Sequence, residues 1–600
     1  MRTAAALALL LLLAGCATTL RSSADLTPEE KVGQLFVVVA KGAFHNESSP
    51  EFRALLHQVR DNHVGGIHWA SGSEVFETAF LTRRLQAAAK IPLLFSADLE
   101  AGPGMRLNDT TYWPWPMAVA ATGDPQLARR EGEIVAQEAR AIGLNQIYAP
   151  VADVNVNPDN PVINVRSFGE DPQEVARFVA AFVSGAQSQG VLATAKHFPG
   201  HGDTATDSHR SLPILKASRE RLEQVELVPF RAAIAAGVGA VMTAHVAVPA
   251  LDATPAPQRL EGLAENPYTH DPAEITPDAT LPASLSPVVT GQLLRGELRF
   301  QGLIVTDALD MGGIVEHFDP AEAAVRAVLA GDDQVLKSTN TDAAVAGVRS
   351  AVASGRIPIG RLEESLRRIL AAKARVGVPL PDFERIFRLV DNPAHRAVCE
   401  EIARRSLTLV REAPGALPLE AGLRVVHVIA SDGGPGKVGE DISRELQARF
   451  RNPPEVFVLD PRSDPKVAEA ALQAAGQADA VVLSLFVRFQ SGRGTLALSD
   501  SSREIVARIA AAGKRIVAVS FGTPYLLREL PQLSTYIAAY GGQSDIQIAV
   551  ARALFGEAAF TGRLPVTIPG LAARGTGIQK PPAHAGKLSA VSCQLSASLP

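Results

Sequence analysis

The segment 191-VLATAKHFPGHGDTATDSHRSLP-213 contains the pattern that decides the fold of this chain. Its apolar, β-rich start, residues 191–196, leads directly into a loop that carries three histidines and two aspartates. Glycines and prolines within that loop exclude a regular helix or strand there. The segment therefore predicts a buried strand whose carboxyl end supplies reactive side chains.

Seven further runs of this kind lie between residues 25 and 378, separated by Ala-, Leu- and Arg-rich stretches typical of helices. The eight expected strands are residues 34–39, 64–69, 91–97, 147–154, 191–196, 238–244, 302–306 and 333–337. Such alternation predicts an α/β fold, a (β/α)8 barrel of the TIM type, rather than an open doubly wound sheet. Residues 252–282 interrupt it with Pro, Asp, Glu and Thr, which indicates a long surface loop, either a tolerated insertion or a substrate-shaping lid.

A second alternating block spans residues 395–570. Its expected strands are residues 424–430, 456–459, 480–485, 515–520 and 536–539. Buried, mostly parallel strands separated by helices predict a three-layer α/β/α sandwich. From residue 571 to 600 the chain is rich in Gly, Ala, Pro and Ser with little periodicity, which predicts a disordered tail.

The first sixteen residues read as a targeting segment. Arg2 precedes an apolar run, residues 4–14, that is too short to span a bilayer but fits the core of a signal peptide. The sequence Leu-Ala-Gly before Cys16 resembles a bacterial lipobox, so residues 1–16 are expected to be a lipoprotein signal with lipidation of Cys16. An ordinary cleaved signal is the alternative. Ala17 favours the periplasmic face of the outer membrane, and Cys399 and Cys593 are expected to be free thiols.

Composition excludes some functions. A formal charge of −5 over 600 residues leaves no basic surplus for nucleic acid. The glycine-rich run at 433–437 ends in Lys437 followed by Val438, whereas a phosphate-binding loop requires Ser or Thr there, so no nucleotide site is expected.

Candidate site residues follow the expected strands, where the active site of an α/β barrel lies. They are Asp98, Glu100 and Arg106 after the third strand, Arg166 after the fourth, Lys196, His197, His201, Asp207 and His209 after the fifth, His245 after the sixth and Asp307 after the seventh. Because polar groups collect at the same end of every strand, we expect one catalytic rim.

The loop after the fifth strand allows two kinds of chemistry. Three histidines and Asp207 could bind zinc, but their spacing differs from the helical i, i+4 pairs of zinc sites, so no metal is expected. Alternatively, Asp207 orients His209, which leaves one ring nitrogen free to exchange a proton. Asp307, at the end of an apolar strand, is the candidate nucleophile, with a helix N-cap as the alternative reading.

These residues resemble glycoside hydrolase family 3, in its bacterial β-N-acetylglucosaminidase branch, over residues 25–570. The resemblance is carried by KHFPGHGDTATDSH at 196–209, VMTAHV at 241–246, LPASLS at 281–286, GLIVTDALDM at 302–311, SADLEAG at 96–102, SFGEDP at 167–172 and GRLPVTIP at 562–569. Two departures are Ala101-Gly102-Pro103, where the family usually shows Gly-Gly-Arg, and the unusually polar stretch 331–337.

The resemblance implies a retaining exo-β-N-acetylglucosaminidase that needs no cofactor. Asp307 would attack the anomeric carbon, and the Asp207–His209 pair would replace the usual carboxylic acid/base. The second domain would then supply no catalytic acid.

The remaining polar residues are expected to bind substrate. Asp98 would accept hydrogen bonds from sugar hydroxyls, while Arg106, Arg166, Lys196 and His197 would donate. Structural ion pairs are the alternative for the two arginines, and loop-ordering roles are the alternative for His201 and His245.

The expected substrate is a terminal β-linked N-acetylglucosaminide on a peptidoglycan fragment, with the protein held in the bacterial envelope by its lipid anchor. A phosphorylase and a non-catalytic wall-binding lipoprotein are the two rival functions.

Overall fold

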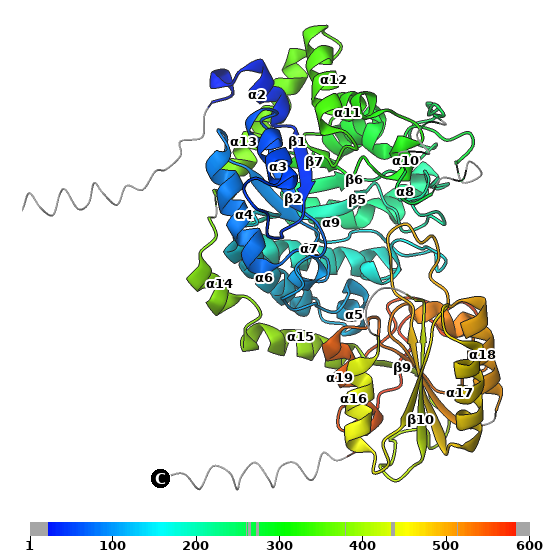
Figure 1. Ribbon diagram of the computed structural model, residues 1–600. Coiled ribbons are helices and arrows are strands. Elements are labelled where there is room, and N and C mark those ends of the chain that lie inside the picture. Colours follow the sequence, from blue (N-terminus) through cyan, green and yellow to red (C-terminus); the bar gives the residue numbers. More distant parts are fainter. Residues whose placement is uncertain are drawn as a thin grey trace, which may run out of the picture.

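The computed structural model describes residues 22–583 except 260, 262, 263, 265, 270, 272–274, 379, 434–437 and 513. Within this part of the chain two α/β domains lie side by side (Figure 1). The predicted lipidation site Cys16 and the thiol of Cys593 lie outside it, whereas Cys399 is buried and free, as expected. No helix in the described ranges is long and apolar enough to cross a membrane.

The first domain is the predicted barrel. Its parallel strands are β1 (Phe36–Ala40), β2 (Gly66–Trp69), β3 (Leu94–Ala97), β4 (Gln146–Ile147), β5 (Leu192–Phe198), β6 (Ala240–Thr243), β7 (Leu303–Thr306) and β8 (Val335–Leu336). Each strand pairs with the next in sequence from β1 to β7, and β8 pairs with β1. One parallel bridge between Val305 and Gln334 joins β7 to β8, so the barrel closes.

The predicted length of the fourth strand is wrong. Residues 147–154 were expected to form the fourth strand, but β4 contains only Gln146–Ile147. Pro150 interrupts this run, and proline cannot donate to a strand ladder. Beyond it, a single bridge joins Val151 to Lys196 of β5.

Helices surround the barrel. The main ones are α3 (Pro50–Arg60), α4 (Val75–Ala88), α6 (Pro125–Ile142), α7 (Pro172–Ser188), α9 (Leu227–Ala235), the π-helix η7 (Pro287–Glu297), α11 (Pro320–Ala330), α12 (Thr341–Ala353) and α13 (Ile359–Val376). The starts of α3, α6, α7 and α11 share one local signal, a Ser or Asp N-cap followed by proline. The cap oxygen accepts amide hydrogens that have no partner within the helix, and proline needs no acceptor there.

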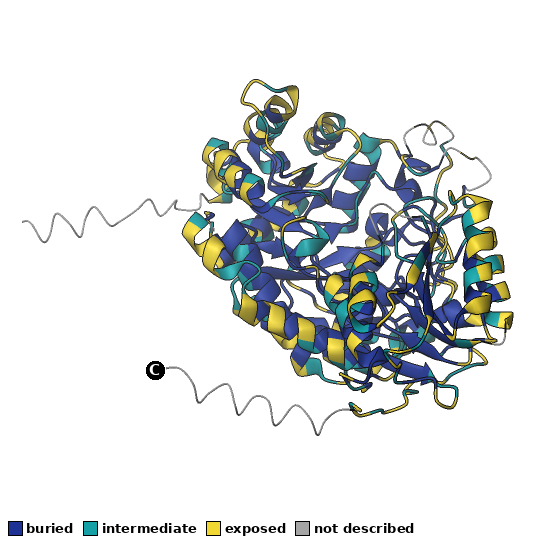
Figure 2. Ribbon diagram, turned by 60° about the horizontal axis from the view of Figure 1, so that its bottom comes forward, coloured by how far each residue is buried: buried dark blue, intermediate teal, exposed yellow. Residues whose placement is uncertain are grey.

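The second domain is the predicted sandwich. Its strands are β9 (Thr408–Arg411), β10 (Val425–Ser431), β11 (Glu455–Leu459), β12 (Ala480–Phe486), β13 (Arg515–Ser520) and β14 (Tyr536–Ala538), in the order β11-β10-β12-β13-β14-β9. All pairs are parallel except that of β14 with β9, an edge strand that the sequence patterns did not predict. Figure 2 shows the strands of both domains buried and the outer helix faces exposed.

Both faces of this sheet are covered. Along β12, Val481 and Leu483 pack with α17 (Pro465–Gln477) and α18 (Asp500–Ala511). The alternate residue Val482 packs with α16 (Glu440–Arg449) and α19 (Ser544–Leu554) on the other face. This alternation is why β12 is apolar throughout, as a doubly covered strand must be.

The predicted disordered tail is wrong for residues 571–583. The Ile578 amide donates to the Leu409 carbonyl at 2.8 Å, and the Ala583 amide donates to the Gly556 carbonyl at 2.8 Å. Backbone hydrogen bonds need no hydrophobic periodicity, so the sequence pattern did not reveal this segment. Residues 584–600 lie outside the described residues.

The two domains share apolar contacts. Helix α5 (Pro116–Ala121) of the barrel domain places Met117 and Ala118 in the sandwich core, where Val165 also packs. Helices α14 (Phe383–Leu389) and α15 (Pro393–Ser406) connect the domains along the chain. The loop after β12 places Phe489 and Ser491 beside residues at the carboxyl ends of the barrel strands.

Candidate active site

A cavity of about 260 Å³ lies at the carboxyl ends of the barrel strands. All but one of the predicted catalytic and substrate-binding residues line it: Asp98, Arg106, Arg166, Lys196, His197, His209 and Asp307. Asp207 is the exception, because its side chain is completely buried behind His209. Sequence reasoning thus located the cavity from the strand ends alone.

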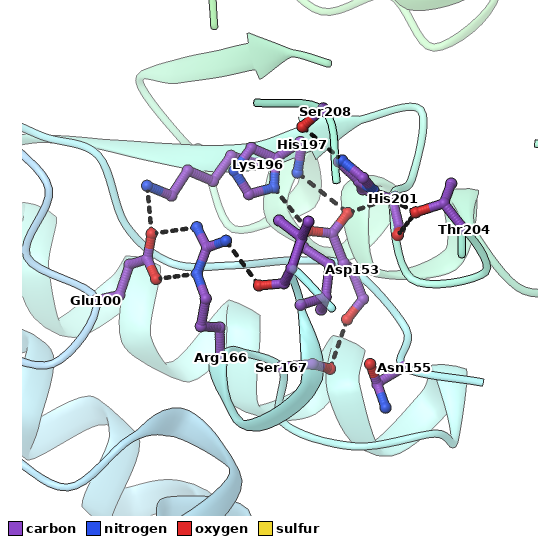
Figure 3. Close-up of polar contacts among 12 residues, drawn as sticks. Glu100, Asp153, Asn155, Arg166, Ser167, Lys196, His197, His201, Thr204 and Ser208 are labelled. Atoms are coloured by element: carbon purple, nitrogen blue, oxygen red, sulfur yellow. Dashed lines mark hydrogen bonds and ion pairs between the residues drawn. The ribbon is translucent and has the colours of Figure 1, made fainter. Parts of the chain in front are cut away.

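Ion pairs connect the charged residues on one side of the cavity (Figure 3). The Lys196 Nζ lies 2.7 Å from Asp98 Oδ1 and 2.6 Å from Glu100 Oε1. Arg166 donates from Nε and Nη2 to the two Glu100 oxygens, each at 2.7 Å. Arg106 donates to Asp98 Oδ2 at 2.5 Å. We call these five residues the charged cluster.

Both carboxylates of the charged cluster are ionised. Burial alone would raise the pKa of Glu100, but the Arg166 and Lys196 cations outweigh burial and lower that pKa to about 2. Burial acts in the same direction on Asp98, and Lys196 and Arg106 hold its pKa well below the ordinary value. Glu100 was among the polar residues noted after the third strand, but no role was predicted for it.

Lys196 and His197 both face the cavity although they are consecutive on a strand. The pairing of β5 with β6 shifts register between Lys196 and Phe198, and this irregularity breaks the normal alternation of sides. His197 Nδ1 lies 2.7 Å from Asp153 Oδ2. Asp153 also accepts the backbone amides of His197 and His201, at 3.2 and 2.8 Å. This buried aspartate, which sequence reasoning missed, holds the start of the loop (Figure 3).

His209 and Asp207 form the expected pair. His209 Nδ1 lies 2.8 Å from Asp207 Oδ1, which also accepts the His209 amide at 2.9 Å. Burial would raise the pKa of Asp207, but the hydrogen bond and charge of His209 lower it below the ordinary value. The carboxylate therefore fixes Nδ1 as the protonated nitrogen and leaves Nε2 to exchange a proton.

Asp307 follows β7 directly and is held by backbone. Its amide donates to the Thr243 carbonyl at 3.0 Å, and its Oδ1 accepts the Ala308 amide at 2.7 Å. The next helix, α10 (Gly312–Val315), has Met311 as its N-cap, so the N-cap reading of Asp307 is wrong.

The electrostatic surroundings keep Asp307 ionised. Burial alone would raise its pKa, but the imidazoles of His197, His245 and His209 and the Ala308 amide together lower it below the ordinary value. An ionised carboxylate on a rigid strand end is what a nucleophile requires.

Comparison with known proteins agrees with this geometry. Residues 27–372 match the family model of the glycosyl hydrolase family 3 N terminal domain, and residues 405–588 match that of the C-terminal domain. The chain belongs to glycoside hydrolase family 3.

Three similar proteins match nearly the whole chain. A β-N-acetylglucosaminidase/β-glucosidase of Cellulomonas fimi is 32% identical over 564 residues, which cover 92% of this chain and 96% of that protein. A solved family 3 β-N-acetylglucosaminidase from Paenibacillus sp. str. FPU-7 is 33% identical, covers 90% of this chain and 99% of its own, and has a TM-score of 0.76. The β-glucoside phosphorylase BglX bound to 2FGlc is 27% identical, with coverages of 91% and 95% and a TM-score of 0.78.

His201 and His245 brace the site of this family 3 protein. His201 Nδ1 and Nε2 contact the Thr204 and Ser208 hydroxyls at 2.7 and 3.0 Å, and burial lowers its pKa to about 4. His245 lies between the Ser284 hydroxyl and the Ala308 carbonyl, at 2.8 and 2.9 Å. Both rings are therefore occupied as loop supports. Among the described residues no three His, Cys, Asp or Glu side chains are placed to hold a metal.

The polar stretch 331–337, which departs from the usual family 3 pattern, makes contacts of two kinds. Asp333 pairs with Arg295 of η7 and Arg368 of α13 and ties these helices to the barrel. At the cavity rim, Lys337 Nζ lies 2.7 Å from Asp310 Oδ2. The Asp333 ion pairs hold helices against the barrel, whereas Lys337 and Asp310 line the cavity.

Proposed function

We propose that the protein is a retaining exo-glycosidase that removes terminal β-linked N-acetylglucosamine. The observation that carries this proposal is that one cavity is lined by an ionised aspartate on a strand end and by an imidazole backed by a buried carboxylate. Two of the similar proteins reported above are named as β-N-acetylglucosaminidases, and their names support the choice of sugar.

In the first step an oxygen of Asp307 attacks the anomeric carbon. The bond from that carbon to the leaving oxygen breaks, and its electron pair stays on the oxygen. His209 donates the proton from Nε2 to this oxygen, while Asp207 stabilises the imidazolium before transfer. The product of this step is a glycosyl ester of Asp307.

The second step reverses these roles. His209, now neutral, takes a proton from water as the water oxygen attacks the anomeric carbon. The bond to Asp307 breaks, and the carboxylate and the protonated imidazole are both regenerated. Two displacements at one carbon leave the sugar with its original configuration.

The charged cluster would bind the sugar. Asp98 accepts hydrogen bonds from hydroxyls, and Arg166, Lys196 and His197 supply donors whose directions their protein partners fix. Arg106 also lines the cavity, where the Ser71 hydroxyl and Asp98 fix its guanidinium.

The proposed source of the sugar is a peptidoglycan fragment, and the proposed location is the bacterial envelope. Both rest on the lipobox-like sequence before Cys16, which would make this residue the lipid-bearing N-terminus and attach the protein to the outer membrane.

A phosphorylase is the second candidate. A neutral imidazole does not repel phosphate as a carboxylate base would, and the chain is similar to a β-glucoside phosphorylase. In that reaction phosphate would attack the glycosyl ester and release a sugar 1-phosphate.

A panel of p-nitrophenyl glycosides, with and without phosphate, tests these alternatives. We expect the N-acetylglucosaminide to be the best substrate, the rate not to depend on phosphate, and NMR to show the β-anomer as first product. A phosphate-dependent rate with sugar 1-phosphate would establish the phosphorylase instead. Binding of the sugar with no turnover of any glycoside would refute both and support the wall-binding lipoprotein.

A further inference from the structure

A loop of the second domain contacts the proposed acid/base pair. Residues 487–494, between β12 and α18, leave the sandwich and reach the barrel domain (Figure 1). The Gly492 amide donates to Asp207 Oδ2 at 2.9 Å, and the Gly492 carbonyl accepts from Arg210 Nη1 at 3.1 Å. Both polar backbone groups of one glycine therefore bind the residues that flank His209.

This contact completes the hydrogen bonding of a fully buried carboxylate. Asp207 Oδ1 accepts from the ring and the amide of His209, so its Oδ2 needs another donor. The Gly492 amide is the donor that reaches it. A buried carboxylate oxygen left without a donor would favour rotation or protonation of the group, and either change would release His209 Nδ1.

Only glycine fits at position 492. Its φ is +76°, a conformation that side chains with a Cβ rarely adopt. A Cβ there would also lie 2.0 Å from Cδ1 of Tyr268, whose ring stands edge-on to the His209 ring at 5.3 Å. A substitution would therefore push the loop away from Asp207 or push Tyr268 towards His209.

The sandwich anchors the loop on both sides of this glycine. Asp432, which follows β10, accepts the Arg488 amide at 2.8 Å and pairs with Arg493 Nη1 at 2.9 Å. Arg493 Nη2 also donates to the Asp432 carbonyl at 2.8 Å. These contacts with Asp432 therefore fix the position of Gly492 relative to the sheet of the second domain.

We propose that Gly492 is a positioning residue through which the second domain orients the Asp207–His209 pair. This inference rests on the proposed function, because it assumes that His209 is the acid/base. The second domain then contributes to proton transfer with a backbone amide and not with a carboxylic acid.

The test compares Gly492→Ala with Gly415→Ala. Gly415 lies in the same domain with a φ of +71°, and a Cβ there meets no atom within 4 Å, so this control carries the same backbone strain away from the site. Two substrates are used, N,N′-diacetylchitobiose, whose leaving oxygen needs a proton, and the 2,4-dinitrophenyl N-acetylglucosaminide, whose leaving group does not.

We expect Gly492→Ala to lower kcat/KM about 100-fold for the disaccharide and less than about 5-fold for the dinitrophenyl substrate. For the dinitrophenyl substrate kcat should nevertheless be low, because hydrolysis of the glycosyl ester needs the base. Azide should restore kcat, since it attacks the glycosyl ester without needing a base. Gly415→Ala should change none of these rates. Asp432→Asn, which weakens the anchor without substituting Gly492, should lower kcat/KM for the disaccharide about 10-fold.

A uniform loss for both substrates, or no loss, in Gly492→Ala would overturn the inference. His209→Ala separates this failure from failure of the proposed function. If His209→Ala shows the leaving-group dependence and azide rescue but Gly492→Ala does not, only the positioning role is wrong. If His209→Ala shows neither the leaving-group dependence nor azide rescue, His209 is not the acid/base. The proposed mechanism and the positioning role of Gly492 then both fail. Thermal unfolding of each variant verifies that it is folded.

Discussion

The two sides of the cavity are held in different ways. The charged cluster is fixed by direct ion pairs between buried side chains, and Lys196 and Glu100 are almost inaccessible to solvent. On the other side, the His209 side chain remains 18% exposed, and single hydrogen bonds from two loops hold it and Asp207. Asp307 lies on the same cavity and is hydrogen-bonded to the backbone of Thr243 and Ala308.

This difference matches two tasks. Recognition of a rigid sugar gains from donors and acceptors that need no rearrangement on binding. Proton transfer needs a group that can move between a leaving oxygen and a water, so a less constrained imidazole is suitable. The comparison predicts that substitutions on the catalytic side affect chemistry, whereas substitutions in the charged cluster affect stability and binding as well.

The largest expected effect is that of Asp307→Asn. The amide keeps the shape of the carboxylate but cannot form the glycosyl ester, so kcat should fall at least about 10⁴-fold for every substrate. Steady-state hydrolysis of the p-nitrophenyl N-acetylglucosaminide measures this loss. Asp310→Asn, the same change at another cavity aspartate, should cost less than about 10-fold. Retention of more than about 1% activity by Asp307→Asn would contradict the nucleophile assignment.

The second-largest loss of activity is expected for Asp207→Asn. The amide can present its NH₂ group to His209 and so favour the wrong tautomer, and kcat/KM for the disaccharide should fall between about 10²- and 10⁴-fold. The matched control is Asp203→Asn, because Asp203 lies on the same loop but pairs with Arg221 at a partly exposed position. Equal losses in the two variants would show that the loop, and not the Asp207–His209 bond, is what matters.

Glu100→Gln tests the charged cluster through the dependence of stability on pH. The folded pKa of Glu100 is about 2, below its ordinary value of 4.5. Its charge therefore stabilises the fold fully above pH 4.5, and this contribution is lost as the pH falls towards 2. The contribution is on the order of 3 kcal/mol at neutral pH.

Denaturant unfolding of both proteins from pH 7 down to pH 3 measures this effect. We expect Glu100→Gln to be less stable at pH 7 and to approach the parent protein as the pH falls. A stability difference that stays constant over this range would mean that the Glu100 charge does not stabilise the fold.

The smallest expected effect is that of Lys337→Gln at the rim. The Lys337–Asp310 pair is partly exposed, and such pairs contribute about 0–1 kcal/mol to stability. We expect a change in Tm within about 2 °C and less than about 5-fold in kcat/KM. A larger loss in kcat/KM that depends on the aglycone would show that the rim takes part in substrate recognition.

Much of the fold followed from the sequence because it depends on local patterns. Eight apolar runs predicted the barrel. Polar residues after the third to seventh runs predicted the cavity and placed Asp307 and His209 on it. The lengths of the strands were harder to predict from the sequence. The apolar residues of the fourth run continue past Pro150, but β4 stops before this proline. The edge strand β9 and residues 571–583 are held by backbone hydrogen bonds, which leave no side-chain pattern.

The sequence by itself determined which reactive residues gather around the cavity, since side chains at strand ends converge in any parallel barrel. Only the tertiary structure decided how they are supported. Asp153 and Glu100 act through partners at least 44 positions away, and Gly492 reaches Asp207 across 285 positions. The contacts of Asp153 and Glu100 depend on how the barrel closes, and that of Gly492 depends on how the two domains dock. Both arrangements are the sum of many weak packing contacts that no single stretch of residues encodes.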